Sequence, residues 1–153
     1  MLLAPALIGI FATTRYRVLT GVLPLDLYVG QRNPHLNECW PSARSFALIT
    51  ACNPGGRPLD ATVNAARQRQ LLTRVEAAGL TRLPTIASDA DGRFAEEGWL
   101  LRDPEPQWFD DIARSFGQIA ILAWRADQPV RLRCYGENPG VPLVQAAHID
   151  FVG

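Results

Sequence analysis

The chain has 153 residues, of which 48% are hydrophobic and 20% are charged, a composition typical of one ordinary globular domain. Its 15 basic residues equal its 15 acidic residues, which excludes the strong positive charge of most nucleic-acid-binding proteins. We therefore expect no nucleic acid and no membrane among its partners.

The cysteines are odd in number and lack the C-x-x-C spacing of a structural zinc site: Cys39, Cys52 and Cys134. A disulfide framework is not expected, and reduced thiols favour a cytoplasmic location. Residues 1–14 are apolar, but no basic residue precedes them and Pro5 and Gly9 interrupt the run. We expect this segment to pack on the core, with a secretory signal as the alternative.

Two short segments near the N-terminus carry alternating apolar residues, 16–18 and 25–29, and together they predict a β-hairpin. A short helix is predicted next. Asn33 has the character of an N-cap, Pro34 suits the first helical position, and Pro41 closes the helix.

The central stretch predicts a strand, a tight loop and a long helix. Residues 46–51 form an apolar run, Asn53-Pro54-Gly55-Gly56 breaks it, and helical spacing resumes over residues 60–78 before Gly79. A strand that ends at a glycine-rich turn before a helix presents backbone N–H groups at the positive end of the helix dipole. We expect the chemistry of the chain to lie there.

A second hairpin is predicted from residues 83–87 and 99–101, with residues 88–92 as its turn. Asp89 and Asp91 imitate part of a calcium loop, but no acid follows at the required offset. The segment is better interpreted as a turn.

A second long helix is predicted after Pro106, with apolar side chains on one face and Gly117 as its cap. Residues 118–124 and 130–134 then predict a third pair of strands. The tail, residues 136–153, has no assigned structure, although it could cover a sheet edge.

From residue 46 onward the predicted order is strand, helix, strand, strand, helix, strand, which is the split pattern of a ferredoxin-like unit. We expect an α+β fold with a mainly antiparallel sheet and two principal helices on one face. The chain is interpreted as a single domain over 1–153, divided into an N-terminal hairpin and short helix (1–44), a ferredoxin-like core (45–135) and a tail (136–153). The uncovered sheet face would be hidden by the N-terminal segment, the tail or a second subunit, so a homodimer is also a hypothesis.

Several stretches together resemble an uncharacterised bacterial family, catalogued as domain of unknown function three-two-nine-three. The matching pieces are residues 14–18, residues 46–55, the helix residues Asn64, Ala66, Arg67 and Leu71, and Phe116-Gly117-Gln118. The resemblance extends to about Tyr135, and members usually carry an aromatic residue where this chain has Cys52. It implies a location for the site and no mechanism.

The candidate ligand-binding residues are amides, glycines and one arginine near the central loop: Asn53, Gly55, Gly56, Asn64, Arg67, Gln68 and Gln118. In the functional interpretation Arg67 pairs with the carboxylate or phosphate of a small anionic ligand, and the amides orient it. In the structural interpretation Asn53 caps the loop, Asn64 ties the loop to the helix, and Arg67 is a brace. Gln118, at a strand start, could instead lie at the opposite end of the sheet.

Other site types have weaker support. The loop lacks both the Lys-Ser/Thr pair of a Walker sequence and the G-x-G-x-x-G pattern, so no cofactor is expected. A Cys52 nucleophile would need His35 or His148 beside it, oriented by an acid such as Asp150. Two isolated histidines give no metal-ligand spacing, so no metal is expected.

The leading hypothesis is a small cytoplasmic binding or regulatory protein with a polar pocket for an anion. One alternative is a hydrolase or transferase that holds an anionic substrate there while water or Cys52 attacks. The other is a protein-interaction module that acts through an open sheet face. Whether the chain is an enzyme is left open, because the sequence pattern contains no convincing general base.

Overall fold

The computed structural model describes residues 2–153, and within them eight strands form one sheet. The strands are β1 (Arg15–Val18), β2 (Leu25–Leu27), β3 (Ser45–Ile49), β4 (Arg82–Ser88), β5 (Glu96–Arg102), β6 (Ala120–Arg125), β7 (Leu132–Tyr135) and β8 (Ile149–Val152). Their order is β2-β1-β4-β5-β3-β6-β7-β8, and every neighbouring pair is antiparallel except β7 and β8. The predicted α+β class and mainly antiparallel sheet are confirmed.

The helices are α1 (Pro5–Thr13), α2 (Pro34–Cys39), α3 (Ala61–Ala77) and α4 (Pro106–Ser115), and η1 (Pro54–Gly56) is a single 3-10 turn. The residues at the helix ends explain where α2 begins and where α3 ends. The Asn33 side chain accepts a hydrogen bond from the Leu36 N–H at 3.2 Å, which confirms the predicted cap of α2. Gly79 follows α3 with a φ of +67°, a conformation that favours glycine. No helix among the described residues is long and apolar enough to cross a membrane.

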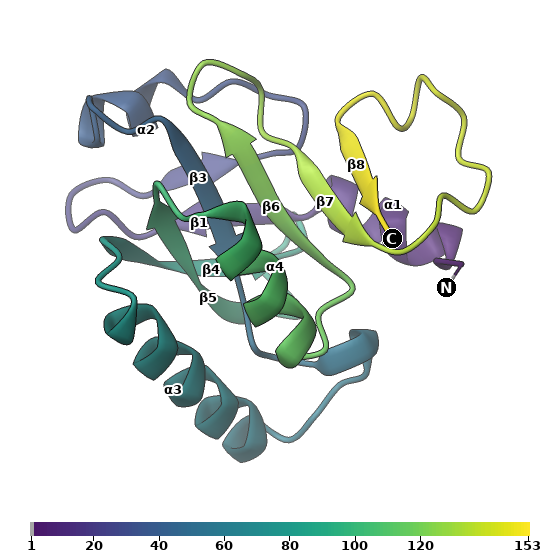
Figure 1. Ribbon diagram of the computed structural model, residues 1–153, viewed down its shortest axis with the longest axis horizontal. Coiled ribbons are helices and arrows are strands. Elements are labelled where there is room, and N and C mark those ends of the chain that lie inside the picture. Colours follow the sequence, from purple (N-terminus) through teal and green to yellow (C-terminus); the bar gives the residue numbers. More distant parts are fainter. Residues whose placement is uncertain (1) are drawn as a thin grey trace.

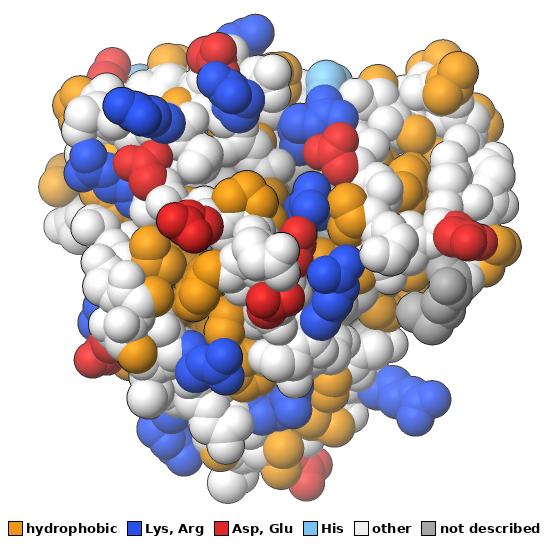
Figure 2. Space-filling view, in the orientation of Figure 1, with side chains coloured by type: hydrophobic (Ala, Val, Ile, Leu, Met, Phe, Trp, Pro, Cys, Tyr) orange, Lys and Arg blue, Asp and Glu red, His pale blue; other side chains and the backbone are white. Residues whose placement is uncertain are grey.

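Helices α3 and α4 pack on the same face of the sheet (Figure 1). Leu71 and Val75 of α3 and Phe109 and Ile112 of α4 are buried in one cluster with apolar side chains of β3, β5 and β6. Burying these side chains stabilises each helix against the sheet by roughly 1.5–3 kcal/mol per residue. Basic and acidic side chains are interspersed over the surface that these helices form (Figure 2).

The opposite face, called the inner face below, is covered from within the chain. Ile8 of α1 and Leu36 of α2 join a second buried cluster with Val18 of β1, Leu48 of β3 and Ile149 of β8. Strands from both ends of the eight-strand order contribute to this one cluster, so the sheet is curled around it. The tail adds β8 in parallel to β7, at the edge of the sheet (Figure 1).

Candidate functional site

The loop after β3 is closed by a pair of asparagines. Asn53 has a left-handed backbone, with φ +49°, which asparagine tolerates better than most residues. Asn64 of α3 accepts a hydrogen bond from the Asn53 N–H at 3.0 Å and donates one to Asn53 Oδ1 at 2.8 Å. Asn53 Oδ1 also accepts from the Leu59 N–H at 2.9 Å. The two amides therefore fix the connection between strand and helix.

Arg67 and Gln68 of α3 bond the backbone on either side of this loop. Arg67 Nε donates to the Ala51 carbonyl oxygen at 2.6 Å, and Nη2 donates to the Phe116 carbonyl oxygen at the end of α4. The guanidinium carbon lies 5.7 Å from the centre of the Phe116 ring. Gln68 Oε1 accepts from the Ala51 N–H at 3.0 Å. Both side chains join α3 to the rest of the core.

Gln118 lies at the same end of the sheet as Asn53, a placement that the sequence left open. Its Nε2 donates to the Cys52 carbonyl oxygen at 3.0 Å. The Gly55 N–H donates to the Gly117 carbonyl oxygen at 2.8 Å, and the Gly56 N–H donates to the Asn53 carbonyl oxygen at 3.0 Å. The structure thus brings all seven predicted residues together around one junction. Their observed bonds are mutual or to backbone, and a ligand-binding role for them stays a prediction.

A cavity of about 680 Å³ lies beside this junction, on the inner face of the sheet. Its lining includes Leu48, Thr85, Glu96 and Leu122 from four strands and Phe11 from α1. Three residues of the predicted constellation also line it: Asn53, Gly56 and Gln118. The junction therefore forms one end of a larger hollow whose remaining walls come from distant parts of the chain.

Two residues with polar side chains, Thr85 and Glu96, line this cavity from neighbouring strands. Thr85 of β4 lies opposite Val18 of β1 and Gly98 of β5, and Val18 belongs to the inner-face cluster. Residues directly opposite each other on paired strands point to the same face of the sheet, so Thr85, like Val18, lies on the inner face. Its side chain is 98% buried, and its hydroxyl oxygen has no hydrogen-bond partner among the described residues. A Cβ atom on Gly98 would lie 2.8 Å from that oxygen, so the close approach requires glycine.

Glu96 lies two residues from Gly98 on the same strand and therefore shares its face. Burial raises the pKa of the Glu96 carboxyl above its ordinary value, and a hydrogen bond from Asn53 opposes part of that change. Among the residues that line the cavity, Asp89, Glu96 and Glu97 are acidic, and none is Arg, Lys or His. The cavity is thus apolar with acidic groups on one side.

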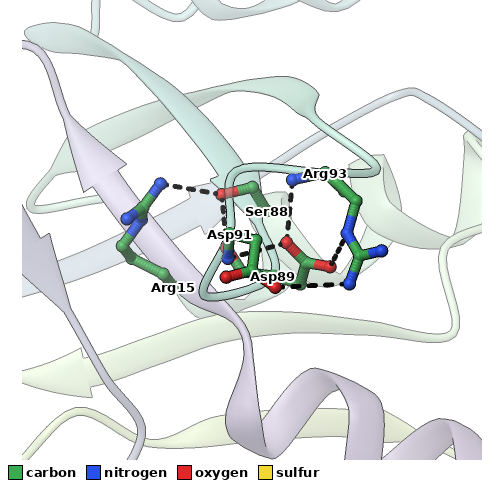
Figure 3. A network of polar contacts seen from close by, with 5 residues as sticks. All are labelled: Arg15, Ser88, Asp89, Asp91 and Arg93. Carbon is green, nitrogen blue, oxygen red and sulfur yellow. Dashed lines mark hydrogen bonds and ion pairs between the residues drawn. The ribbon is translucent and has the colours of Figure 1, made fainter.

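The β4–β5 turn forms part of the cavity rim, and Figure 3 shows its polar network. Asp89 Oδ1 accepts from the N–H groups of Asp91 at 3.0 Å and Arg93 at 2.8 Å, which confirms the turn interpretation of this segment. The Arg93 guanidinium bonds both aspartates, and Arg15 of β1 donates to Ser88 at 3.3 Å. These bonds fix the turn beside the mouth of the cavity.

The groups of the hypothetical cysteine nucleophile are not assembled: His35 and Asp150 have other partners, and the buried Nδ1 of His148 has no partner among the described residues. His35 lies 3.5 Å from Glu38, and Asp150 bonds Arg131 at 2.9 Å. No hydrogen bond joins Cys52 to a histidine in the part of the chain that the structure describes. Burial raises the pKa of the Cys52 thiol, and the charges of Glu96 and Glu97 raise it further, although a hydrogen bond from Thr50 opposes them. Such a thiol is a poor nucleophile at neutral pH.

Sequence reasoning missed Thr85 and Glu96. The predicted turn ended at residue 92 and the predicted strand began at Trp99, so Glu96 belonged to neither. The observed strand β5 begins earlier, at Glu96. The available signal was the spacing of Glu96, Gly98 and Leu100, because residues two positions apart on a strand share one face. Recognising it requires knowing which face of β5 is the inner one.

Comparison with protein families gives one match. Residues 49–121 match the model of a family described as Protein of unknown function (DUF3293). The match confirms the family resemblance over residues 49–121, a segment that contains both the junction and the cavity residues Thr85 and Glu96. The resemblance of residues 14–18 and of the chain beyond residue 121 lies outside the matched segment. Neither the curated proteins nor the solved structures gave a match.

Proposed function

We propose, for a chain whose residues 49–121 match a family without an assigned activity, that it is a small binding protein that holds a largely apolar ligand in the inner-face cavity. One observation carries this proposal: the cavity of about 680 Å³ is lined by Glu96 and by Thr85, whose buried hydroxyl has no hydrogen-bond partner within residues 2–153. Known ligand pockets have volumes of about 300–1,000 Å³ and combine apolar walls with a few polar groups.

The walls of the cavity are suited to an apolar ligand. Ile10 and Phe11 of α1 face it from one side, and Leu48, Ile119 and Leu122 line it from the sheet and its connections. Transfer of apolar surface from water to such walls contributes about 25 cal/mol per Å² before the costs of association. The few polar groups would set orientation and selectivity.

The charge of the cavity favours a ligand different from the anion that the sequence suggested. Arg67 directs two of its donors to backbone carbonyl groups, so these donors already have partners within the fold. The cavity itself contains the Glu96 carboxyl, which has no ion pair among the described residues, and its ionised form repels an anion. We therefore propose an uncharged or cationic ligand in place of the anion.

An enzyme that uses the same cavity is the second candidate, and Glu96 is the observation that favours it. A carboxyl group with a raised pKa inside a cleft is a frequent general acid or base. A hydrolase or transferase would convert a bound ligand, and Glu96→Gln would stop the conversion. A binding protein would return the ligand unchanged, as mass spectrometry of the recovered ligand would show.

Three finer proposals accompany the function. Strands β4, β5, β3 and β6 are adjacent in that order, which supports a ferredoxin-like unit at the centre of the sheet. The unpaired Cys39, Cys52 and Cys134 support a cytoplasmic location. Homodimerisation is retained as a proposal, and light scattering at high protein concentration tests it by the measured mass.

The proposed function is tested with N-phenyl-1-naphthylamine, an uncharged probe whose fluorescence rises in apolar surroundings. Ala120→Phe places a ring in the cavity, and Ala78→Phe is the matched control on the exposed end of α3. We expect the wild type and the control to enhance the fluorescence and Ala120→Phe to lose the enhancement while still melting cooperatively. Equal enhancement by all three proteins, or none by the wild type, would contradict the proposal. If Ala120→Phe does not fold, Ala87→Phe, on β4, takes its place.

A further inference from the structure

We propose that the ligand carries a protonated amine on an apolar body, and that the Glu96 carboxylate and the Thr85 hydroxyl bind this amine inside the cavity. The inference rests on the proposed function and adds the chemical class of the ligand.

The first support is the sign of the charges that face the cavity. Glu96 is the acidic lining residue whose side chain lies on the inner face, because Asp89 pairs with Arg93 at 3.2 Å and Glu97 follows Glu96 on β5 and points to the other face. Among the described residues no basic side chain lines the cavity. No ion pair joins Glu96 to a basic group within residues 2–153. A carboxylate removed from water without a cation is costly, and a bound cation offsets that cost.

The raised pKa of Glu96 agrees with this geometry. Burial disfavours the ionised carboxylate in the absence of ligand. An ammonium group within about 4–6 Å would favour the ionised form again, because opposite charges stabilise each other strongly where water is excluded. The Asn53 amide lowers the pKa of Glu96 in part, but an amide cannot supply the missing positive charge.

The second support is the hydroxyl of Thr85, which has no hydrogen-bond partner in the part of the chain that the structure describes. A hydroxyl oxygen accepts hydrogen bonds, and an ammonium group has three donors. Thr85 lies opposite Gly98, and Gly98 is two positions from Glu96 on β5. The distance along the strand between these two positions is about 7 Å. The Thr85 side chain occupies the space over Gly98, since a Cβ atom there would lie 2.8 Å from the Thr85 oxygen. The Thr85 oxygen is covered in the ligand-free protein. One ammonium group donates to the carboxylate and, once the Thr85 side chain rotates about its Cα–Cβ bond, to the hydroxyl.

The third support is the aromatic character of the surrounding wall. Phe11, Tyr16 and Phe94 line the cavity, and aromatic faces attract organic cations as well as apolar groups. The Tyr16 hydroxyl donates to the Phe11 carbonyl oxygen at 2.8 Å, so its ring has a fixed position. Within the described residues no group of three or more His, Cys, Asp or Glu could hold a metal ion, which favours an organic cation.

The test uses three probes with the same body and different head groups: 4-phenylbutylamine, 4-phenylbutanol and 4-phenylbutyrate. Isothermal titration calorimetry at pH 7 measures their Kd values for the full chain. We expect the amine to bind at least about tenfold more tightly than the alcohol, and the carboxylate to bind most weakly. Glu96→Gln should weaken amine binding about tenfold and leave alcohol binding within about twofold.

Two further variants complete the test. Thr85→Val keeps the shape of the side chain, removes the hydroxyl, and should weaken amine binding about threefold to tenfold. Glu105→Gln, an exposed change at the start of α4 and outside the cavity, should change no Kd. If Glu96→Gln does not fold, the comparison of Thr85→Val with the wild type and the ranking of the three head groups still decide the inference.

The outcomes separate the inference from the proposed function. If the alcohol binds as tightly as the amine, or if Glu96→Gln leaves the amine unaffected, the ligand class is wrong and the cavity remains a binding site. If the carboxylate binds most tightly, the ligand class is also wrong, and the anion of the sequence-based hypothesis is favoured. If none of the three probes binds and N-phenyl-1-naphthylamine does not bind either, both proposals fail.

Discussion

Arg67 of α3 donates a hydrogen bond to the carbonyl oxygen of Ala51, the second residue after β3, at a distance of 2.6 Å. The bond fixes the long helix against the end of the central strand. A second donor of the same guanidinium bonds Phe116 at the end of α4, so one side chain connects three elements. Arg67 thereby stabilises the fold beside the cavity.

Arg67→Ala should therefore destabilise the protein in the absence of any ligand. Two carbonyl groups lose charge-assisted hydrogen bonds, and we expect a loss of about 2–4 kcal/mol in the free energy of unfolding. Chemical denaturation measures the change. Arg69→Ala, at an exposed position of the same helix, is the matched control and should cost less than about 0.5 kcal/mol. Equal stabilities of the two variants would contradict the bracing role of Arg67.

Glu96→Gln should raise the stability of the ligand-free protein at neutral pH. The folded state holds the Glu96 proton to a higher pH than the unfolded chain, so the wild type loses stability as pH rises from the unfolded pKa, about 4.3, through the folded pKa. Glutamine does not ionise and avoids this loss. The Tm of the variant should thus exceed that of the wild type by more at pH 7.5 than at pH 4. Each kcal/mol of difference in the free energy of unfolding corresponds to about 2–4 °C in Tm.

The comparison with the wild type isolates Glu96 from the other titratable groups near it. Tyr16, Cys52, Asp89 and Glu97 are present in both proteins, so their contributions largely cancel in the difference. A Tm difference that is independent of pH between 4 and 7.5 would show that the Glu96 carboxyl has the same pKa in the folded and unfolded states.

Asp110 should determine part of the stability at acid pH. Burial opposes its ionisation, but hydrogen bonds from Arg133 and Tyr135 outweigh burial and lower its pKa. The stabilisation is therefore complete above the unfolded pKa, about 3.9, and is lost as pH falls through the lower folded pKa. Asp110→Asn leaves the Arg133 charge unpaired and should cost about 3–5 kcal/mol at pH 7.

The neighbouring residue offers a control for Asp110. Asp111 is exposed, and its side chain accepts hydrogen bonds from Gln107 on the same helix. Asp111→Asn should change the free energy of unfolding by less than about 0.5 kcal/mol. Urea titrations at pH 7 and at pH 3 should show a much smaller acid-induced loss for Asp110→Asn than for this control.

Phe94 at the cavity rim has a left-handed backbone, with φ +58°, and its side chain is 86% exposed. This conformation costs about 1 kcal/mol more for a residue with a Cβ atom than for glycine. Phe94→Gly should therefore be more stable than Phe94→Ala, by roughly 1 kcal/mol in chemical denaturation. If the alanine variant were the more stable of the two, the turn would have a different conformation in solution.

Much of the fold was predictable because its signals are local. The cap of α2 needs only Asn33 and Pro34, and the extent of α3 follows from apolar spacing that ends before Gly79. The hairpin of β1 and β2 likewise follows from alternation within a dozen residues. The clustering of Asn53, Asn64 and Arg67 was predictable for the same reason, since one helix face carries two of them.

The cavity was not predictable, because it depends on long-range pairing. Thr85 and Glu96 become neighbours only when β4 pairs with β5, and the curl of the sheet decides which face encloses them. The tail shows the same limit. Its β8 pairs in parallel with β7 across an intervening loop, and the sequence of the tail has no alternating pattern that specifies that partner.

The central claim is that a ligand binds in the inner-face cavity and not at the asparagine and arginine junction. This claim can be tested by nuclear magnetic resonance of the ¹⁵N-labelled protein during titration with 4-phenylbutylamine. Binding in the cavity should produce the largest amide shift changes at Thr85, Glu96 and Gly98. Changes confined to Asn64, Arg67 and Gln68, or no changes at saturating probe, would contradict it.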